Sequence, residues 1–261
     1  MTGLLDIRGL QVTYDSGRRA VDGLDLSLSE GEQLALIGES GSGKSTLALA
    51  IAGLLPPDSR IAGRVEWPGF RNPPRNGRDI GYVFQDAGAS LDPVMRVGHQ
   101  VAEVAATQLG LSWKASLDHA AQMFARVKLP EPRTMLRAYP HQLSGGQRQR
   151  VGIAAAIAAG PRLLIADEPT SALDTIVQAD IMRLLGDLAR EASMALLLVT
   201  HDIALAAQYC ERIAVMRNGR ILETGPVSRI VTQPADPYTR TLIDACLTLD
   251  DEADRPRGRA P

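Results

Sequence analysis

The stretch Gln33-Leu34-Ala35-Leu36-Ile37-Gly38-Glu39-Ser40-Gly41-Ser42-Gly43-Lys44-Ser45 decides the fold of this 261-residue chain. Residues 34–37 are continuously apolar, which is typical of a strand buried on both faces. The next eight residues match G-x-x-x-x-G-K-[ST], and the pattern from Thr46 to Leu54 predicts a helix. A strand, a glycine-rich loop and a helix in this order are the context in which such a loop binds phosphate.

The glycines of the loop are required because phosphate must approach the backbone closely. They let a nest of N–H groups point inward at the start of the following helix. Lys44 supplies a positive charge for the β- and γ-phosphates, and the Ser45 hydroxyl suits a magnesium ion. We therefore expect a nucleoside triphosphate to bind at Gly38, Ser40, Gly41, Gly43, Lys44, Ser45 and Thr46.

A second polar feature follows the apolar run from Leu163 to Ala166, which ends in Asp167-Glu168. Asp167 lies at the end of a predicted buried strand, where it can hold Mg²⁺ through water. The side chain of Glu168, one residue later, points elsewhere. Taken alone, the pair has an alternative reading as solvated carboxylates at a strand end; beside an intact glycine loop, phosphoryl-transfer chemistry is favoured.

The pentad Leu143-Ser144-Gly145-Gly146-Gln147 lies between these two features and precedes a predicted helix, which Ser144 can cap. With the loop upstream and the carboxylates downstream, the chain resembles the ATP-binding cassette (ABC) family over most of its length. The resemblance implies an α/β fold: a P-loop NTPase (RecA-like) core with a mostly parallel sheet, an N-terminal antiparallel β subdomain and an inserted α-helical subdomain. We expect one ABC ATPase domain over residues 1–249, with the helical subdomain at approximately 90–160.

The family also implies roles for single residues. Glu168 orients or activates the attacking water, His201 is the switch histidine that contacts the γ-phosphate, and Gln85 senses Mg²⁺ and the water. Tyr14 resembles the aromatic residue that stacks on adenine, although a strand tyrosine is commonly a packing residue. His201 and Gln85 also have structural alternatives: His201 as a structural or surface residue, and Gln85 as a surface residue at a strand end.

The pentad implies a partner. In the family, two cassettes form a head-to-tail dimer in which this helix start closes on the γ-phosphate held by the other chain, because exposed N–H groups at a helix start bind anions. Residues 171–174 match the segment that crosses the interface. We therefore expect nucleotide contacts in the opposite site from Ser144, Gly145, Gly146, Gln147 and Asp174.

Composition narrows the function classes. The formal net charge of −2 argues against a nucleic-acid binder with a broad basic surface. No segment is apolar and uncharged for the ~18 residues of a membrane span, and Cys210 and Cys246 have no paired spacing that predicts a disulfide framework or zinc site. The alternation of strands and helices predicts α/β architecture. Its elements include strands at Leu4–Ile7 and Leu10–Tyr14, a helical pattern from about Val97 to Val127, and a disordered tail at 250–261.

Several stretches resemble one subgroup, the importers of oligopeptides, dipeptides, nickel and metal-chelator complexes. They are residues 84–93, Tyr139-Pro140-His141-Gln142 and Asp236-Pro237-Tyr238-Thr239-Arg240-Thr241-Leu242. Within the last stretch, the tetrad at 237–240 has no expected role in ATP chemistry. Many members continue into a cysteine cluster resembling an iron–sulfur ligand set; with Cys246 alone we expect no such cluster, which favours the nickel and metallophore branch.

The subgroup implies partners and a location. We expect a second ABC ATPase subunit, with a heterodimer favoured over a homodimer, two integral membrane permease subunits and an extracytoplasmic substrate-binding protein. The chain then lies peripherally on the cytoplasmic face of a bacterial inner membrane. The segment around Ala89, Leu91 and Met95 is expected to receive a short helix of the membrane subunit. A soluble ABC ATPase uncoupled from transport, or a subunit for another cargo, is the alternative.

Overall fold

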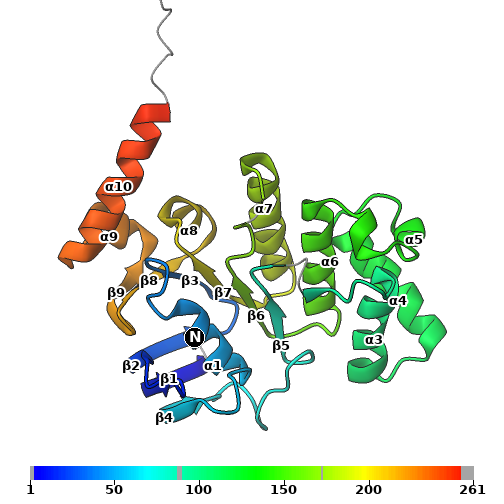
Figure 1. Ribbon diagram of the computed structural model, residues 1–261, viewed down its shortest axis with the longest axis horizontal. Coiled ribbons are helices and arrows are strands. Elements are labelled where there is room, and N and C mark those ends of the chain that lie inside the picture. The colour runs from blue at the N-terminus through cyan, green and yellow to red at the C-terminus, as the bar shows by residue number, and fades with distance from the viewer. Residues whose placement is uncertain (1–2, 87–89, 172, 254–261) are drawn as a thin grey trace, which may run out of the picture.

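Two sheets form the framework of the computed structural model, which describes residues 3–86, 90–171 and 173–253, with side chains described up to residue 245. A three-stranded antiparallel sheet has the order β2-β1-β4, and a six-stranded sheet has the order β5-β6-β7-β3-β8-β9 (Figure 1). The strands are β1 (Gly3–Thr13), β2 (Arg19–Ser29), β3 (Gln33–Ile37), β4 (Arg60–Glu66), β5 (Ile80–Val83), β6 (Leu163–Asp167), β7 (Ala195–Thr200), β8 (Arg212–Arg217) and β9 (Arg220–Pro226).

The helices fall into an inserted group and a group that covers the large sheet. Helices α3 to α6 follow β5 and precede β6, and they lie together at one end of the molecule, on the right in Figure 1. The helices are α1 (Lys44–Ala52), α3 (Val97–Leu109), α4 (Trp113–Arg126), α5 (Pro132–Met135), the 3-10 helix η1 (Pro140–Gln142), α6 (Gly145–Ile157), α7 (Thr175–Glu191), α8 (Ile203–Tyr209), α9 (Val227–Thr232) and α10 (Pro237–Ala253).

Alternating side chains of the six-stranded sheet enter two different cores. In β3, Leu34 and Leu36 pack with α1 and the antiparallel sheet, whereas Ala35 and Ile37 pack with the helices of the other face. This alternation follows from the two-residue period of a strand. Because both faces are covered, the central strands are apolar except at their ends, as the sequence predicted for residues 34–37.

The order of the parallel strands brings the polar loops together. Strands β6, β7 and β3 are adjacent, with Asp167 opposite Val199 and Ile37 opposite Thr200. The carboxyl ends of these strands therefore meet at one edge of the sheet, where ligands bind in open α/β sheets. The glycine loop after β3, Glu168 after β6 and His201 after β7 all lie at this edge.

Three local predictions need correction. The strands predicted at Leu4–Ile7 and Leu10–Tyr14 form one strand, β1, whose register against β2 shifts between Ile7 and Leu10. The helical pattern from Val97 to Val127 is two helices, since Gly110 adopts a left-handed conformation with φ 68° and ends α3. Strand β9 was not expected at all; it pairs antiparallel with β8 at the edge of the sheet.

The C-terminal prediction changes as well. Helix α10 continues to Ala253, so residues 250–253 extend a helix instead of beginning a disordered tail. Residues 254–261 lie outside the described part of the chain, as do Ala89, Ala172 and the side chain of Cys246. The tail prediction for 254–261 therefore stays a prediction.

Candidate nucleotide site

The glycine loop wraps around the N-terminus of α1. Gly43 has φ 107°, and a Cβ atom at this position would lie 2.2 Å from the carbonyl oxygen of Ala20. Only glycine fits this backbone conformation and this close approach without a shift. The loop therefore keeps the N–H groups at the start of α1 accessible to an anion.

Lys44 is buried within the loop, at 4% exposure. Its Nζ donates hydrogen bonds to the carbonyl oxygens of Gly38, at 2.7 Å, and Glu39, at 2.9 Å. Burial lowers the pKa of Lys44, while the nearby carboxylates of Glu168 and Asp167 raise it in part. A buried cation held by neutral carbonyls is a good partner for an arriving anion, which is the arrangement expected of a phosphate site.

Asp167 is positioned at the end of β6 by two hydroxyl groups. The Ser45 Oγ donates to its Oδ1 at 3.0 Å, and the Tyr82 hydroxyl donates to its Oδ2 at 3.0 Å. Burial raises the pKa of Asp167, and these two hydrogen bonds oppose that rise. Burial likewise raises the pKa of Tyr82, so its hydroxyl remains a donor.

The donor set of Ser45 and Asp167 fits Mg²⁺, which binds hydroxyl, carboxylate, water and phosphate oxygens. Within residues whose side chains are described, no group of three or more His, Cys, Asp or Glu side chains forms a metal cluster. One carboxylate and one hydroxyl suit a cation that arrives with its phosphates, because Mg²⁺ is usually bound by one or two carboxylates together with substrate phosphates.

Glu168 lies close to the other two predicted catalytic residues, Gln85 and His201. Its Oε2 accepts a hydrogen bond from Gln85 Nε2 at 3.2 Å and lies 3.7 Å from His201 Nδ1. The backbone of Glu168 has φ 43°, a left-handed conformation that is uncommon for a residue with a side chain. Such strain is typical of functional sites.

Most of the predicted nucleotide-binding residues line one cavity of about 350 Å³. The Tyr14 hydroxyl lies 2.9 Å from Thr46 Oγ1 at its wall. Arg18 and Ala20, which the sequence did not predict, also contribute, and Arg18 Nη2 donates to the Gly41 carbonyl. The predicted residues in the wall are Tyr14, Ser40, Gly41, Gly43, Lys44, Ser45, Thr46, Gln85 and Glu168.

The pentad lies elsewhere: none of its described residues lines this cavity. Ser144 and Gln147 form a capping box at the start of α6, in which Ser144 Oγ accepts from the Gln147 N–H and Gln147 Oε1 accepts from the Ser144 N–H. A Cβ on Gly146 would lie 2.7 Å from Val177, so α6 packs closely on the start of α7, which Asp174 caps. The structure thus groups the pentad with Asp174 and separates both from the loop of the same chain.

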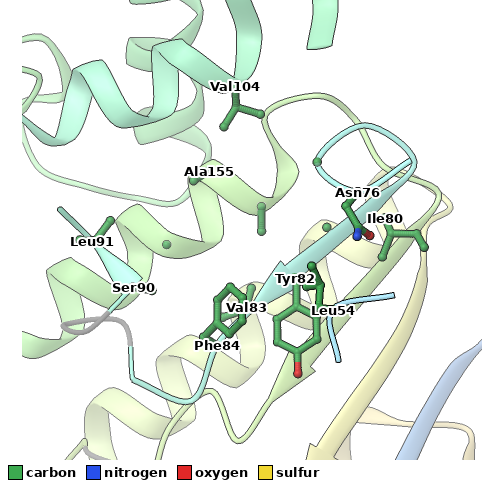
Figure 2. Close-up of a pocket in the computed structure, with 14 residues that line it drawn as sticks. Leu54, Asn76, Ile80, Tyr82, Val83, Phe84, Ser90, Leu91, Val104 and Ala155 are labelled. Atoms are coloured by element: carbon green, nitrogen blue, oxygen red, sulfur yellow. The ribbon is translucent and has the colours of Figure 1, made fainter. Parts of the chain in front are cut away.

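A second cavity, of about 280 Å³, lies between β5, α3 and α6. Figure 2 shows Val83, Phe84, Leu91, Val104 and Ala155 around it, from segments far apart in the sequence. Its lining is largely apolar.

Across the described residues, no helix has both the length and the apolar character needed to cross a membrane.

The comparisons with known proteins agree with this geometry. The ABC transporter family matches residues 21–171. The chain is 42% identical to the oligopeptide transport ATP-binding protein OppD of Salmonella typhimurium, over 95% of this chain and 78% of that protein. It is also 42% identical to the dipeptide transport ATP-binding protein DppD of Haemophilus influenzae, over 92% of this chain and 76% of that protein.

Solved structures support the fold. A dimeric, post-hydrolysis structure of the ATP-binding cassette MJ0796 bound to ADP and Pi superposes with a TM-score of 0.74, at 30% identity, covering 86% of this chain and 99% of that one. The cassette cbiO1 of Clostridium perfringens, part of the ABC transporter complex cbiONQ, has the same TM-score at 26% identity, covering 98% of this chain and 100% of that one. With its phosphate loop, paired carboxylates and pentad all in place, this chain belongs to the ABC transporter family, as an ATP-binding cassette ATPase.

Proposed function

We propose that this chain is the ATP-hydrolysing subunit of a bacterial ABC importer for peptides. The observation that carries the proposal is the convergence of Lys44, Ser45 and Asp167 with Gln85, Glu168 and His201 at one edge of the sheet. The names of the relatives, oligopeptide and dipeptide transport proteins, support peptides as cargo over nickel or metal-chelator complexes.

The residues divide the hydrolysis reaction between them. The loop N–H groups and Lys44 bind the phosphates and neutralise charge on the β- and γ-phosphoryl oxygens. Ser45 and Asp167 would hold Mg²⁺, which supplies further charge neutralisation at those oxygens. Glu168 accepts a hydrogen bond from the attacking water and orients it in line with the γ-phosphorus. Gln85 and His201 hold Glu168 at one oxygen and leave its other oxygen for this water.

The second half of the site comes from another cassette. The Ser144 cap and the exposed start of α6 form an anion-binding surface that lies apart from the loop of its own chain. We propose that this surface closes on the γ-phosphate held by a partner cassette, with a heterodimer favoured. Two permease subunits and an extracytoplasmic binding protein complete the importer, and this chain lies at the cytoplasmic face of the membrane.

The first test concerns this shared site. The isolated chain, diluted until light scattering shows a monomer, is expected to show no ATPase activity, because no helix start completes its site. The purified membrane complex is expected to contain a second, different cassette. Activity of the monomer would contradict the shared site, and two copies of this chain with no other cassette would contradict the heterodimer.

The apolar cavity between β5, α3 and α6 is the proposed binding site for a short helix of the membrane subunit. Leu91 lines it and is buried, and Met95 is half-buried, so substitutions there would also disturb packing. Phe84 lines the same cavity and is 44% exposed, which makes it the better probe. An apolar groove with an exposed aromatic residue suits an amphipathic helix.

Phe84→Glu is therefore expected to uncouple the importer. A charge buried at the contact should reduce peptide uptake by reconstituted vesicles at least about tenfold, while the affinity of the purified chain for ATP changes less than about twofold. Ile61→Glu, at an exposed apolar residue on the antiparallel sheet, serves as the matched control. Uptake at the wild-type rate in Phe84→Glu would mean that the membrane-subunit helix binds elsewhere.

A further inference from the structure

The tetrad at residues 237–240 contacts the phosphate loop, although no role in ATP chemistry is expected from its residue types. Tyr238, at the start of α10, is 7% exposed, and its hydroxyl accepts a hydrogen bond from the backbone N–H of Glu39 at 3.1 Å. These two residues are 199 positions apart in the sequence. The loop is thus held from outside by a segment that follows the last strand of the sheet.

The hydrogen bond to Tyr238 involves the peptide group between Gly38 and Glu39, which also contacts Lys44. The N–H of Glu39 and the carbonyl of Gly38 belong to one planar peptide unit. The carbonyl accepts from Lys44 Nζ at 2.7 Å, while the N–H donates to Tyr238. Tyr238 and Lys44 therefore hold opposite ends of the same peptide, whose carbonyl is one of the two that hold the Lys44 ammonium.

Tyr238 is itself rigidly placed. The guanidinium carbon of Arg217 lies 4.4 Å from the centroid of its ring, a cation–π contact. Its backbone N–H donates to Asp236 Oδ1 at 2.8 Å. The hydroxyl is neutral, because burial raises the pKa of Tyr238 by more than the Glu39 N–H and the charge of Arg217 lower it.

The segment before Tyr238 is fixed to β9 through Glu223. This buried carboxylate accepts from the backbone N–H groups of Ala235, at 3.0 Å, and Asp236, at 3.1 Å. Burial raises the pKa of Glu223, but these hydrogen bonds lower it more, so it lies below its ordinary value. Glu223 stays ionised and anchors the turn that presents Tyr238.

We infer that Tyr238 is a positioning residue of the phosphate-binding loop, which it holds in the conformation that receives nucleotide. The inference rests on the proposed role of that loop. Loss of the hydroxyl frees one end of the Gly38–Glu39 peptide, and the loop must then be ordered when nucleotide binds. The segment that marks the importer subgroup in the sequence thereby acts on ATP binding.

The test compares Tyr238→Phe with Tyr209→Phe in the full-length chain. Tyr238→Phe removes only the hydroxyl and keeps the ring under Arg217. Tyr209, on α8, makes no hydrogen bond to the loop among the described residues and loses the same atom. Two quantities are measured: the Kd for ADP by calorimetry, since ADP is not consumed, and the hydrogen-exchange rate of the Glu39 amide.

The expected result is a Kd for ADP raised about 3- to 10-fold in Tyr238→Phe, the effect of one hydrogen bond, with faster exchange at Glu39. Tyr209→Phe should change neither. An unchanged Kd overturns the inference even if exchange is faster, because the bond is then purely structural. A raised Kd with unchanged exchange also overturns it, because the effect then runs through another contact.

If residues 38–45 are not the nucleotide-binding loop, a different result is expected. In that case Lys44→Met would bind ADP as tightly as the wild-type chain does. Thermal unfolding of both tyrosine variants, followed without nucleotide, checks that each is folded before the Kd values are compared.

Discussion

Replacing Glu168 by glutamine is expected to leave ATP binding intact and to slow ATP hydrolysis at least ~10²-fold, since loss of a positioned proton acceptor has about that effect. The amide of glutamine is nearly the same size and its oxygen can still accept from Gln85, so the geometry of the site is preserved. What disappears is the negative charge that faces the attacking water and His201.

The measurement is single-turnover hydrolysis of saturating ATP by the assembled complex, with the Kd for ATP determined in parallel. Glu103→Gln, an exposed glutamate on α3, is the matched control and should hydrolyse ATP like the wild type. Wild-type turnover in Glu168→Gln would remove Glu168 from its proposed role and leave the reaction without an identified acceptor.

The second large effect is expected at Lys44. Lys44→Met keeps most of the side-chain volume but removes the charge, and hydrogen bonds to charged groups contribute ~1.5–3 kcal/mol. The affinity for ATP should therefore fall about 10- to 100-fold. Because Lys44 is buried and its pKa is already lowered by that burial, the empty protein gives up a desolvated cation and should still fold.

The convenient measurement is the rise of Tm with ATP concentration, because a ligand that binds only the folded state stabilises it. Wild-type protein should show a concentration-dependent rise, and Lys44→Met should show it only at much higher ATP. Lys114→Met, at an exposed lysine on α4, is the control. An equal rise in Lys44→Met and wild type would mean that the nucleotide binds elsewhere.

Much of the site could be predicted from sequence because its parts are local. The loop, the Asp167-Glu168 pair and the pentad each need a few residues at fixed spacing beside a strand or a helix, and such spacing is visible in one dimension. Their predicted elements, β3, β6 and α6, are all present in the structure. The ABC ATPase core followed from these motifs and their order.

Other features depend on residues that are distant in the chain. Nothing near Asp167 shows that Tyr82 donates to it, and nothing near the loop shows that Arg18 lies in the cavity wall. The split of the helix between Val97 and Val127 was also missed, because the apolar period continues across Gly110. Strand β9 was missed because it forms by pairing with β8 at the edge of the sheet, and the position of that edge depends on the whole sheet.

The amino-acid sequence by itself indicated the chemistry of this protein: which groups we propose to bind phosphate, which carboxylates are available and which helix start we propose to serve a second cassette. These are properties of residue types at short spacing. Only the tertiary structure decided which groups support them, above all the hydroxyl of Tyr238 on the peptide that also holds Lys44. The physical reason is that a hydrogen bond across 199 residues depends on how α10 packs, against α8 among other contacts, which no local pattern records.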